Sequence, residues 1–391
     1  MKTRTLLAGV LSLIVAGSAA AGTGTYYVYE VLHHFTGGAD GGGPSGLVEH
    51  TPGVYWGVTS GGGDRAGSGT VFRFVPGQAP VTKHVFNLSE GMQPGNKLVS
   101  VAGALYGTTS IGGDFTNGTV FSISDSSYSV VHHITNDEGW PVNGPLISVG
   151  GYLYGVTGGY GALGGGTVFR ADPKTGAGVV MHNYPKPDGY EEPQGPLVRH
   201  GNGLLYGTTA SLGNYTTGTA FSLNTKGVYQ TRHSFGPFPE GNEPVTGLSL
   251  DASGELLGAT SYGGLDDRGT VFKMTPTGQV TVLHDFQDGV DGWLANTAMV
   301  LSSNGTAYGT TFYAHQRPYG EHSGCGSIFY VTSSGLFKTW WLFDDDWDES
   351  KGCHLAGITP GSDGHFYGTM VRGGSTGHGV IFRLRKVVGG Q

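Results

Sequence analysis

The stretch Gly151-Tyr-Leu-Tyr-Gly-Val-Thr157, followed by Gly166-Thr-Val-Phe-Arg170, is the unit from which this chain of 391 residues is built. The two signatures, with close variants, occur together seven times. The glycine of the Tyr-Gly signature recurs at Gly57, Gly107, Gly155, Gly207, Gly258, Gly309 and Gly368. Successive glycines are 50, 48, 52, 51, 51 and 59 residues apart. Such a period is typical of repeat architectures, in which each unit buries its faces against its neighbours.

Each repeat predicts about four short strands. A strand ending in His-x-Phe is followed by a turn rich in Gly, Pro, Asp and Asn, and then by a short apolar run such as residues 145–149. The Leu-Tyr-Gly-Thr-Thr strand, a glycine-rich hairpin and the Gly-Thr-Val-Phe strand complete the repeat. No segment has a sustained helical period, so we expect almost no helix. The sequence therefore predicts an all-β, seven-bladed β-propeller.

The two ends of the repeat array are complementary. The first His-x-Phe strand, Tyr26 to Phe35, precedes the first Tyr-Gly signature, and no such strand follows Gly379-Val-Ile-Phe382 in the last repeat. We expect the N-terminal strand to complete the last blade, which closes the ring and removes an exposed sheet edge.

Residues 1–21 have the pattern of a secretory signal peptide. Lys2 and Arg4 form the charged start, residues 6–15 the apolar run, and residues 19–21 the small-residue cleavage site. The apolar run is too short to span a bilayer. We therefore expect residues 22–391 to form a single propeller domain, secreted or periplasmic after removal of the signal peptide.

The composition narrows the class of partner. Charged residues make up 13% of the chain and the net charge is −8, which argues against nucleic acid and against an anionic membrane surface. The 74 glycines stand at fixed columns of the repeat, so we interpret them as turn and close-packing positions. We expect a monomer without membrane insertion.

The repeat itself resembles a known family. Leu105-Tyr-Gly-Thr-Thr-Ser-Ile-Gly-Gly113 followed by Gly118-Thr-Val-Phe121 resembles the GloVer-type tandem repeat of exported bacterial proteins. The resemblance covers all seven repeats. It implies the propeller architecture and attaches little activity to it.

One column of the repeat carries histidine: His33, His84, His132, His182, His233 and His284, with Trp341 in the seventh place. Symmetric copies cannot converge on one asymmetric substrate. We expect these residues to solve a packing or hydrogen-bonding problem present in every blade. The sequence leaves open whether they line the central tunnel or lie between blades.

The sixth and seventh repeats are irregular and contain both cysteines. The two signatures are 17 residues apart in the sixth repeat, from Gly309 to Gly326, against 11 or 12 elsewhere. Cys325 lies in that insert, and Cys353 follows an irregular segment of the next repeat. An isolated pair in an exported protein predicts a disulfide. With His322 and His354, the same thiols form a Cys2His2 set suited to structural zinc, and both alternatives stay open.

Three of the six tryptophans, Trp340, Trp341 and Trp347, fall in the same region beside the acidic run 344–349. They predict either core packing or, if exposed, a platform for stacking sugar rings. The acidic run lacks the spacing of a known calcium loop, so we expect a solvated loop.

A second resemblance concerns catalysis. No phosphate loop or HExxH motif is present. The spacing of Tyr154 and Arg170, and of Tyr367 and Arg383, is similar to that in propeller polysaccharide lyases such as ulvan lyases. The resemblance implies tyrosine as base or acid, histidine as its partner, and arginine neutralising a uronate carboxylate. His315, in the insert, completes an asymmetric set with Tyr367 and Arg383.

Two classes of function follow. One is a carbohydrate-active propeller, a lyase that cleaves a uronic-acid-containing polysaccharide by β-elimination. The alternative is a non-catalytic scaffold that binds glycan or protein. The expected partner is an acidic polysaccharide or another glycan, and the expected cofactor, if there is one, is structural zinc.

Overall fold

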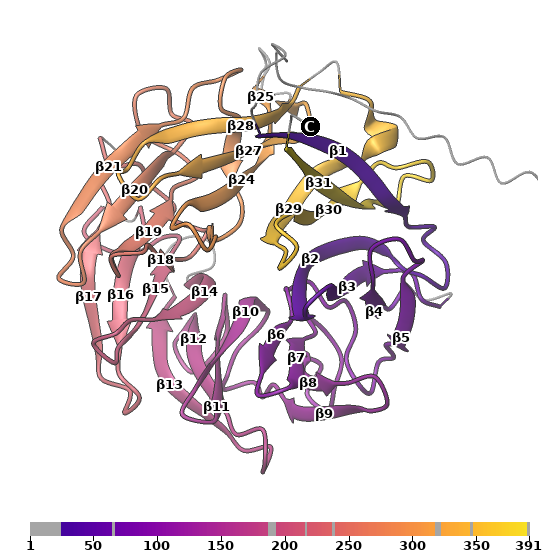
Figure 1. Ribbon diagram of the computed structural model, residues 1–391. Coiled ribbons are helices and arrows are strands. Elements are labelled where there is room, and N and C mark those ends of the chain that lie inside the picture. The colour runs from indigo at the N-terminus through magenta and orange to yellow at the C-terminus, as the bar shows by residue number, and fades with distance from the viewer. Residues whose placement is uncertain are drawn as a thin grey trace, which may run out of the picture.

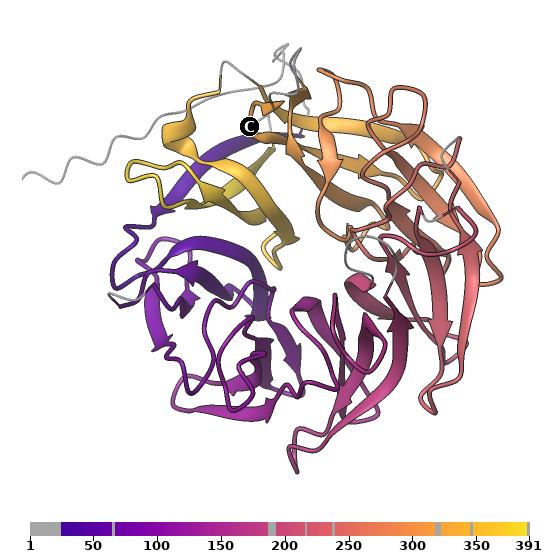
Figure 2. The same ribbon diagram turned by 180° about the vertical axis from the view of Figure 1, so that it is seen from behind.

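Seven antiparallel sheets are arranged as a ring of blades, as the computed structural model shows from both sides (Figures 1 and 2). The structure describes residues 25–64, 67–186, 193–215, 217–236, 239–316, 322–344 and 347–388, with Gln316, His322 and Ser323 as backbone only. The predicted signal peptide, residues 1–21, lies outside the described residues. The predicted all-β, seven-bladed propeller is confirmed.

In the first five blades the strands follow one another outward from the axis. Blades one and two consist of β2 (Gly42–Thr51), β3 (Val54–Gly61), β4 (Thr70–Phe74) and β5 (Val81–Val85), and of β6 (Val99–Val101), β7 (Ala104–Thr108), β8 (Thr119–Ile123) and β9 (Tyr128–His133). Blade three consists of β10 (Val142–Val149), β11 (Tyr152–Thr157), β12 (Gly164–Ala171) and β13 (Gly178–Pro185). Blades four and five consist of β14 (Pro193–Arg199), β15 (Leu205–Thr209), β16 (Thr219–Leu223) and β17 (Tyr229–Ser234), and of β18 (Ser249–Leu250), β19 (Leu256–Ala259), β20 (Thr270–Met274) and β21 (Val280–Asp285).

The last two blades depart from this order. Blade six consists of β22 (Trp293–Ala295), β23 (Val300–Leu301), β24 (Ala307–Tyr313), β27 (Gly326–Val331) and β28 (Phe337–Phe343), and its insert forms the hairpin β25 (His315–Gln316) and β26 (His322–Ser323). Blade seven consists of β29 (Cys353–Pro360), β30 (Phe366–Arg372), β31 (Val380–Val388) and β1 (Thr25–His34). The 3-10 turn η1 (Glu349–Lys351) is the one helical element of the described residues.

The N-terminal strand closes the ring, as predicted. β1 pairs antiparallel with β31 and lies beside it in Figure 1, although the two strands come from opposite ends of the chain. Glu30 stands opposite Arg383 and accepts a hydrogen bond from its Nε at 2.9 Å. The neighbouring Tyr29 is buried in the core between blades six and seven. The first and last segments of the propeller therefore share one sheet.

The two sequence signatures recur together because one makes room for the other. Gly155 on β11 pairs with Phe169 on β12. A Cβ atom on Gly155 would lie 2.7 Å from the Phe169 ring and 2.9 Å from Leu146. The equivalent glycine of every other blade faces the equivalent phenylalanine in the same way. A larger residue would therefore displace a core ring in a close-packed interior.

The hydrophobic core lies between blades rather than within them. One cluster joins Trp56 and Val71 of blade one to Phe86, Leu98 and Phe121 across the junction with blade two. Similar clusters occupy the other junctions. Each blade thus depends on its neighbours for burial of its faces. No helix within the described ranges is long and apolar enough to cross a membrane.

Ring closure generates the first prediction. Deletion of residues 25–35 removes the outer strand of blade seven and exposes the edge of β31, so we expect a lower melting temperature and aggregation. Circular dichroism and light scattering measure the two effects. Tyr26→Ala, at a position that is 42% exposed, is the matched control and should leave both unchanged. A deletion variant that melts as the wild type does would contradict the closure.

Candidate functional site

The repeated histidines lie on the outer strands, directly after a bulge. In blade three the register shifts between Val168 and Phe169, which places His182 opposite Val168. The same shift occurs at the other histidines. In five of the six, Nε2 hydrogen-bonds a carboxylate in the loop that enters the next blade: His33–Asp40 and His84–Glu90 at 3.1 Å, and His132–Glu138, His233–Glu240 and His284–Asp291 at 2.7 Å. The loop that follows His182 lies partly outside the described residues.

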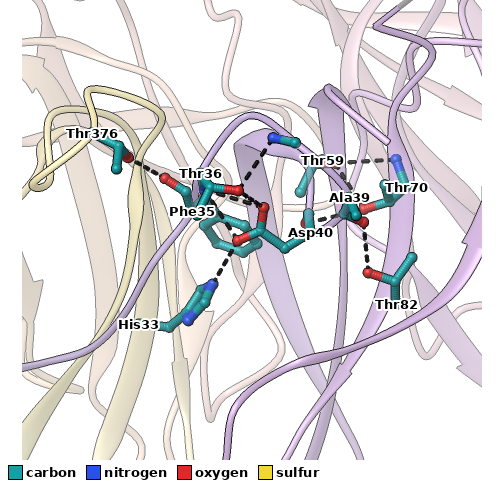
Figure 3. A network of polar contacts seen from close by, with 10 residues as sticks. His33, Phe35, Thr36, Ala39, Asp40, Thr59, Thr70, Thr82 and Thr376 are labelled. Carbon is teal, nitrogen blue, oxygen red and sulfur yellow. Dashed lines mark hydrogen bonds and ion pairs between the residues drawn. The ribbon is translucent and has the colours of Figure 1, made fainter. Parts of the chain in front are cut away.

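Figure 3 shows this arrangement at the first junction. The Asp40 carboxylate accepts hydrogen bonds from His33 Nε2 and from the backbone N–H of Thr36, both at 3.1 Å. The Asp40 carbonyl accepts one from Thr70 Oγ1 at 3.5 Å, and Thr70 Oγ1 is 2.9 Å from Thr59 Oγ1. The carboxylate thus ties the outer strand of one blade to the loop, and the threonine pair of the next blade ties the same loop to that blade.

The histidine–carboxylate contact together with the hydroxyl pair, which we call the junction clasp, is described at five junctions, and the junction of blades three and four shows the hydroxyl pair. The hydroxyl pairs are Thr59–Thr70, Thr109–Thr119, Thr157–Thr167, Thr209–Thr219, Thr260–Thr270 and Thr311–Ser327. We call the carboxylate residue of each clasp the clasp acid. Thr119, Thr167 and Thr270 also donate to the backbone carbonyl of the clasp acid of their junction at 2.7–2.8 Å. The histidine column therefore lies between blades and holds them together, in agreement with the structural role expected from its symmetry.

The junction between blades six and seven lacks the clasp. Trp341 replaces the histidine, and Lys351 stands before Gly352 where the other junctions have an acid before a glycine. Met370 and Val380, both fully buried, replace the two threonines. A covalent bond between Cys325 of blade six and Cys353 of blade seven spans the same junction. The disulfide therefore stands where the polar contacts have been lost.

The disulfide also bears on the predicted zinc site. Cys325 and Cys353 form a disulfide, which is one of the two alternatives that the sequence left open. Their sulfurs and a carboxylate oxygen of Glu349 lie within 4.8 Å of one another, but His354 is not in this group. The His354 ring instead stacks on Phe312 with a centroid distance of 4.4 Å. The His322 side chain is outside the described part. This geometry does not support the predicted Cys2His2 set as ligands of zinc.

The three clustered tryptophans pack in the interior of the same junction. Trp341 is buried, and Trp340 and Trp347 pack against the core cluster that contains Tyr29. The indole N–H of Trp347 donates to the carbonyl of Gly352 at 2.8 Å. The three rings pack against the core and do not form an open platform. This arrangement is the core-packing alternative. Of the acidic run, residues 345 and 346 lie outside the described residues.

The strand register brings Tyr367 beside Arg383. Tyr367 is 0% exposed, its ring lies 4.4 Å from that of Tyr55, and its hydroxyl donates to Asp363 at 2.7 Å. Burial, with the hydrogen bond to Asp363, raises the pKa of Tyr367 to about 12. Arg383 is engaged by Glu30 of β1. Both side chains therefore have internal partners.

The other predicted pair and the loop histidine are placed separately. Tyr154 stands opposite Arg170, but it is buried, and the Arg170 guanidinium lies 4.4 Å over the ring of Tyr152. His315 belongs to the hairpin β25–β26 and pairs with Ser323 in its register. Within the described residues, no hydrogen bond, ion pair or ring contact joins His315 to either tyrosine-arginine pair. Catalytic roles for these five residues stay predictions.

A cavity of 610 Å³ runs along the axis and is lined by the inner strands of all seven blades. Glycines, prolines, threonines and amide side chains make up about half of the lining residues, and most of the others are apolar. Three asparagines of the inner ring join one blade to the next, through hydrogen bonds from Asn96 to the Val142 carbonyl, from Asn143 to the Pro193 carbonyl and from Asn296 to the Leu355 carbonyl. The channel is thus a rigid, largely uncharged tube.

Lys97 is the only charged side chain among the residues that line this channel. Its ammonium donates to Thr359 Oγ1 at 3.0 Å. The side chain is half-buried in the channel wall. Desolvation consequently lowers the pKa of Lys97 to about 8. A cation that makes no ion pair within the described residues is thus held in the wall of the channel.

The sequence contains a signal for this lysine outside the two repeat signatures. In every repeat one residue precedes the first apolar residue of the short run that leads to the Tyr-Gly signature, as Pro145 precedes Leu146. It is Gly46, Pro145, Pro196, Gly247, Ala298 or Gly357 in six repeats and Lys97 in the second. The lysine therefore stands out in an aligned set of repeats, although the second repeat has no insertion and lies away from the irregular sixth and seventh repeats.

Comparison with sequence families agrees with the fold. The model of the Gloeobacter/Verrucomicrobia repeat matches residues 17–157, 67–250, 125–321 and 237–390, which together cover nearly the whole chain. A search of curated proteins finds no significant match.

Solved propellers of several kinds are similar in structure. An oligogalacturonate lyase in complex with manganese has a TM-score of 0.58 and 11% identity, with 96% of each chain covered. The extracellular domain of a B. thetaiotaomicron protein named as a hybrid two-component system has a TM-score of 0.59 and 10% identity; 91% of this chain spans 40% of that one. A puromycin-hydrolyzing peptidase of Mycobacterium tuberculosis has a TM-score of 0.50 and 14% identity, with 92% and 58% covered. Such identities show a shared fold and not a shared activity.

The clasp generates a prediction at its most buried member. His132→Ala leaves the Glu138 carboxylate, whose side chain is 4% exposed, without its ring partner, and should lower the free energy of unfolding by about 1–3 kcal/mol. His378→Ala, at an exposed position, is the control. Denaturant unfolding measures both. An H132A variant as stable as the wild type would contradict the clasp.

The same variant has a predicted pH dependence. Burial lowers the pKa of His132, but hydrogen bonds to Glu138 and to the Gly176 carbonyl, with the Glu138 charge, outweigh it and leave the pKa raised. A histidine whose pKa is higher in the folded state stabilises the fold most at a pH below its unfolded-state pKa of about 6.5. This stabilisation is lost as the pH rises through the folded-state pKa. The wild type and H132A should therefore differ most in mildly acidic solution.

The disulfide generates the next prediction. Replacing Cys325 and Cys353, which are 28 residues apart, with serine should lower the free energy of unfolding by about 2–4 kcal/mol. A reductant should lower the melting temperature of the wild type and leave that of the double variant unchanged. Equal melting temperatures for oxidised wild type and double variant would show that the bond does not hold this junction.

Proposed function

The chain belongs to the Gloeobacter/Verrucomicrobia repeat family, and we propose that it is an exported propeller that binds a sugar unit of a glycan in its central channel. The observation that carries the proposal is the channel itself. Its volume of 610 Å³ lies within the range of about 300–1,000 Å³ found for small-molecule sites. All seven blades contribute to its wall, so the whole repeat array is used to form one asymmetric site.

The lining of the channel suits a polyhydroxylated ligand. Amide side chains both donate and accept hydrogen bonds, as sugar hydroxyls do. Three asparagine amides of the wall are engaged by neighbouring blades. The Gln194 amide lines the cavity and makes no hydrogen bond within the described residues. Phe312, on the same wall, offers an apolar surface to the carbon face of a sugar ring.

Cleavage by β-elimination is the second candidate. The observation that favours it is the register, which does pair Tyr367 with Arg383. Elimination beside a carboxylate needs a base, a cation and an acid around one exposed substrate. Tyr367 is buried and Arg383 is paired with Glu30, so these groups would first have to become accessible. Binding requires no such rearrangement, and for that reason we place it first.

Export is part of the proposal and rests on two observations. The first 21 residues have the composition of a signal peptide. The disulfide between Cys325 and Cys353 is of a kind that persists in oxidising compartments.

One experiment separates the two candidates. The purified chain from residue 22 onward is mixed with uronate-containing and neutral oligosaccharides, while calorimetry records binding and ultraviolet absorbance records unsaturated uronate. We expect heat of binding without a rise in absorbance. Rising absorbance would establish elimination instead.

Channel variants locate the site. Ala298→Trp narrows the channel and should abolish binding, while Leu301→Trp, at a position 41% exposed on β23, is the matched control and should not. Binding that survives Ala298→Trp with unchanged affinity would place the ligand elsewhere.

A further inference from the structure

Lys97 crosses the inner edge of a whole blade to reach its partner. It lies just before β6 in blade two, and Thr359 lies on β29 in blade seven, with blade one between them. The aliphatic part of its side chain passes over Gly46 of blade one, where a Cβ atom would lie 3.2 Å from the lysine Cβ and 3.3 Å from its Cγ. Glycine at position 46 thus leaves room for the lysine side chain. The hydrogen bond to Thr359 holds the ammonium at a fixed place in the channel.

The hydrogen bonds at this point leave donors unused. Thr359 Oγ1 donates to the Leu47 carbonyl, so that it can only accept from Lys97. An ammonium has three donors, and one of them is taken by Thr359. No carboxylate of the described residues lies within ion-pair distance of Lys97 in the channel. Two donors and the whole charge therefore have no protein partner within the described residues, and the side chain lines the cavity.

A lone buried cation is unfavourable unless an anion accompanies it. The chain could have placed a small residue here, as the other six repeats do. We propose that Lys97, held by Thr359, is the recognition group for a single carboxylate of the ligand. The inference rests on the proposed function and names its ligand class, a sugar acid bound through its carboxylate.

The chemistry of the site favours a carboxylate over a phosphate ester. A phosphate group carries up to two charges and is usually met by several cations or by a cluster of backbone N–H groups. The channel offers one ammonium among its charged side chains. A carboxylate matches the single positive charge of this site. Its two oxygens can accept hydrogen bonds from the two remaining N–H groups of the ammonium.

Recognition by this lysine has a pH signature. The pKa of Lys97 lies near 8 in the unliganded channel because of desolvation, and a bound anion must raise it. The affinity for an anionic ligand should therefore decrease as the pH rises above about 8, while the affinity for a neutral sugar should not. A lysine with an ordinary pKa would keep the affinity constant to about pH 10.

The test compares galacturonate with galactose by calorimetry at pH 7 and pH 9, with inorganic phosphate as a third probe. We expect galacturonate to bind the wild type more tightly than either of the others. Lys97→Met, which keeps the length of the side chain, should weaken galacturonate binding at least about tenfold and leave galactose binding unchanged. Lys338→Met, at an exposed position on β28, is the charge-matched control.

The outcomes separate the two proposals. If galacturonate and galactose bind equally and Lys97→Met changes neither, the inference is overturned and the proposed function stands. Tighter binding of phosphate than of galacturonate also overturns it, in favour of a phosphorylated ligand. If no probe binds the wild type, the proposed function fails and the inference fails with it. Thermal unfolding of Lys97→Met at the wild-type temperature shows that lost binding does not come from lost folding.

Discussion

The fixing of each blade against the next is the constraint on which the rest of the structure depends, and at five junctions a hydrogen bond from a histidine to a carboxylate in the loop entering the next blade serves it. A four-stranded sheet of this size cannot bury its own faces, so every blade must be fixed against its neighbour. The acidic residue of the clasp lies in the loop that leads to the inner strand of the next blade, and in two blades it almost touches that strand, with Asp40 two residues before β2 and Asp291 two residues before β22. The clasps that hold the blades together therefore also place the wall of the channel.

Much of the fold could be predicted from the sequence because the signatures reflect contacts that every blade repeats. Gly155 and Phe169 recur together since one leaves space for the other, and the missing last strand pointed to β1. The histidine column had a predictable role for the same reason. Its place between blades could not be predicted, because the bulge that places His182 opposite Val168 leaves no mark in the residue types.

The candidate site was harder to predict, because residue type does not show burial. Tyr367 and Arg383 have the chemistry of catalytic groups and the predicted pairing, yet Tyr367 is buried against the neighbouring blade and Arg383 is paired with Glu30 of β1. Likewise, Cys353 and His354 are adjacent in sequence, but the cysteine bonds to Cys325 while the ring stacks on Phe312. The informative position was the one where a single repeat differs from the others without any insertion, at Lys97.

A symmetric ring acquires an asymmetric site by changing one member of a repeated set. Two such changes stand out. At the junction of blades six and seven the clasp is replaced by apolar side chains and a disulfide, which alters how the blades are held. On the inner ring, Lys97 replaces a small residue and brings a charge into an otherwise uncharged channel. The first change concerns stability, and the second gives the channel a chemical preference.

The proposed recognition site depends most directly on whether the Lys97 ammonium is an unpaired, desolvated cation. Nuclear magnetic resonance of protein with isotope-labelled lysine side chains, assigned by comparison with Lys97→Met, measures its pKa. We predict one lysine that titrates near pH 8 in the unliganded protein and moves to higher pH when galacturonate is added. If every lysine titrates near the ordinary value of about 10.4, the channel does not enclose an unpaired cation, and the account of the site is wrong.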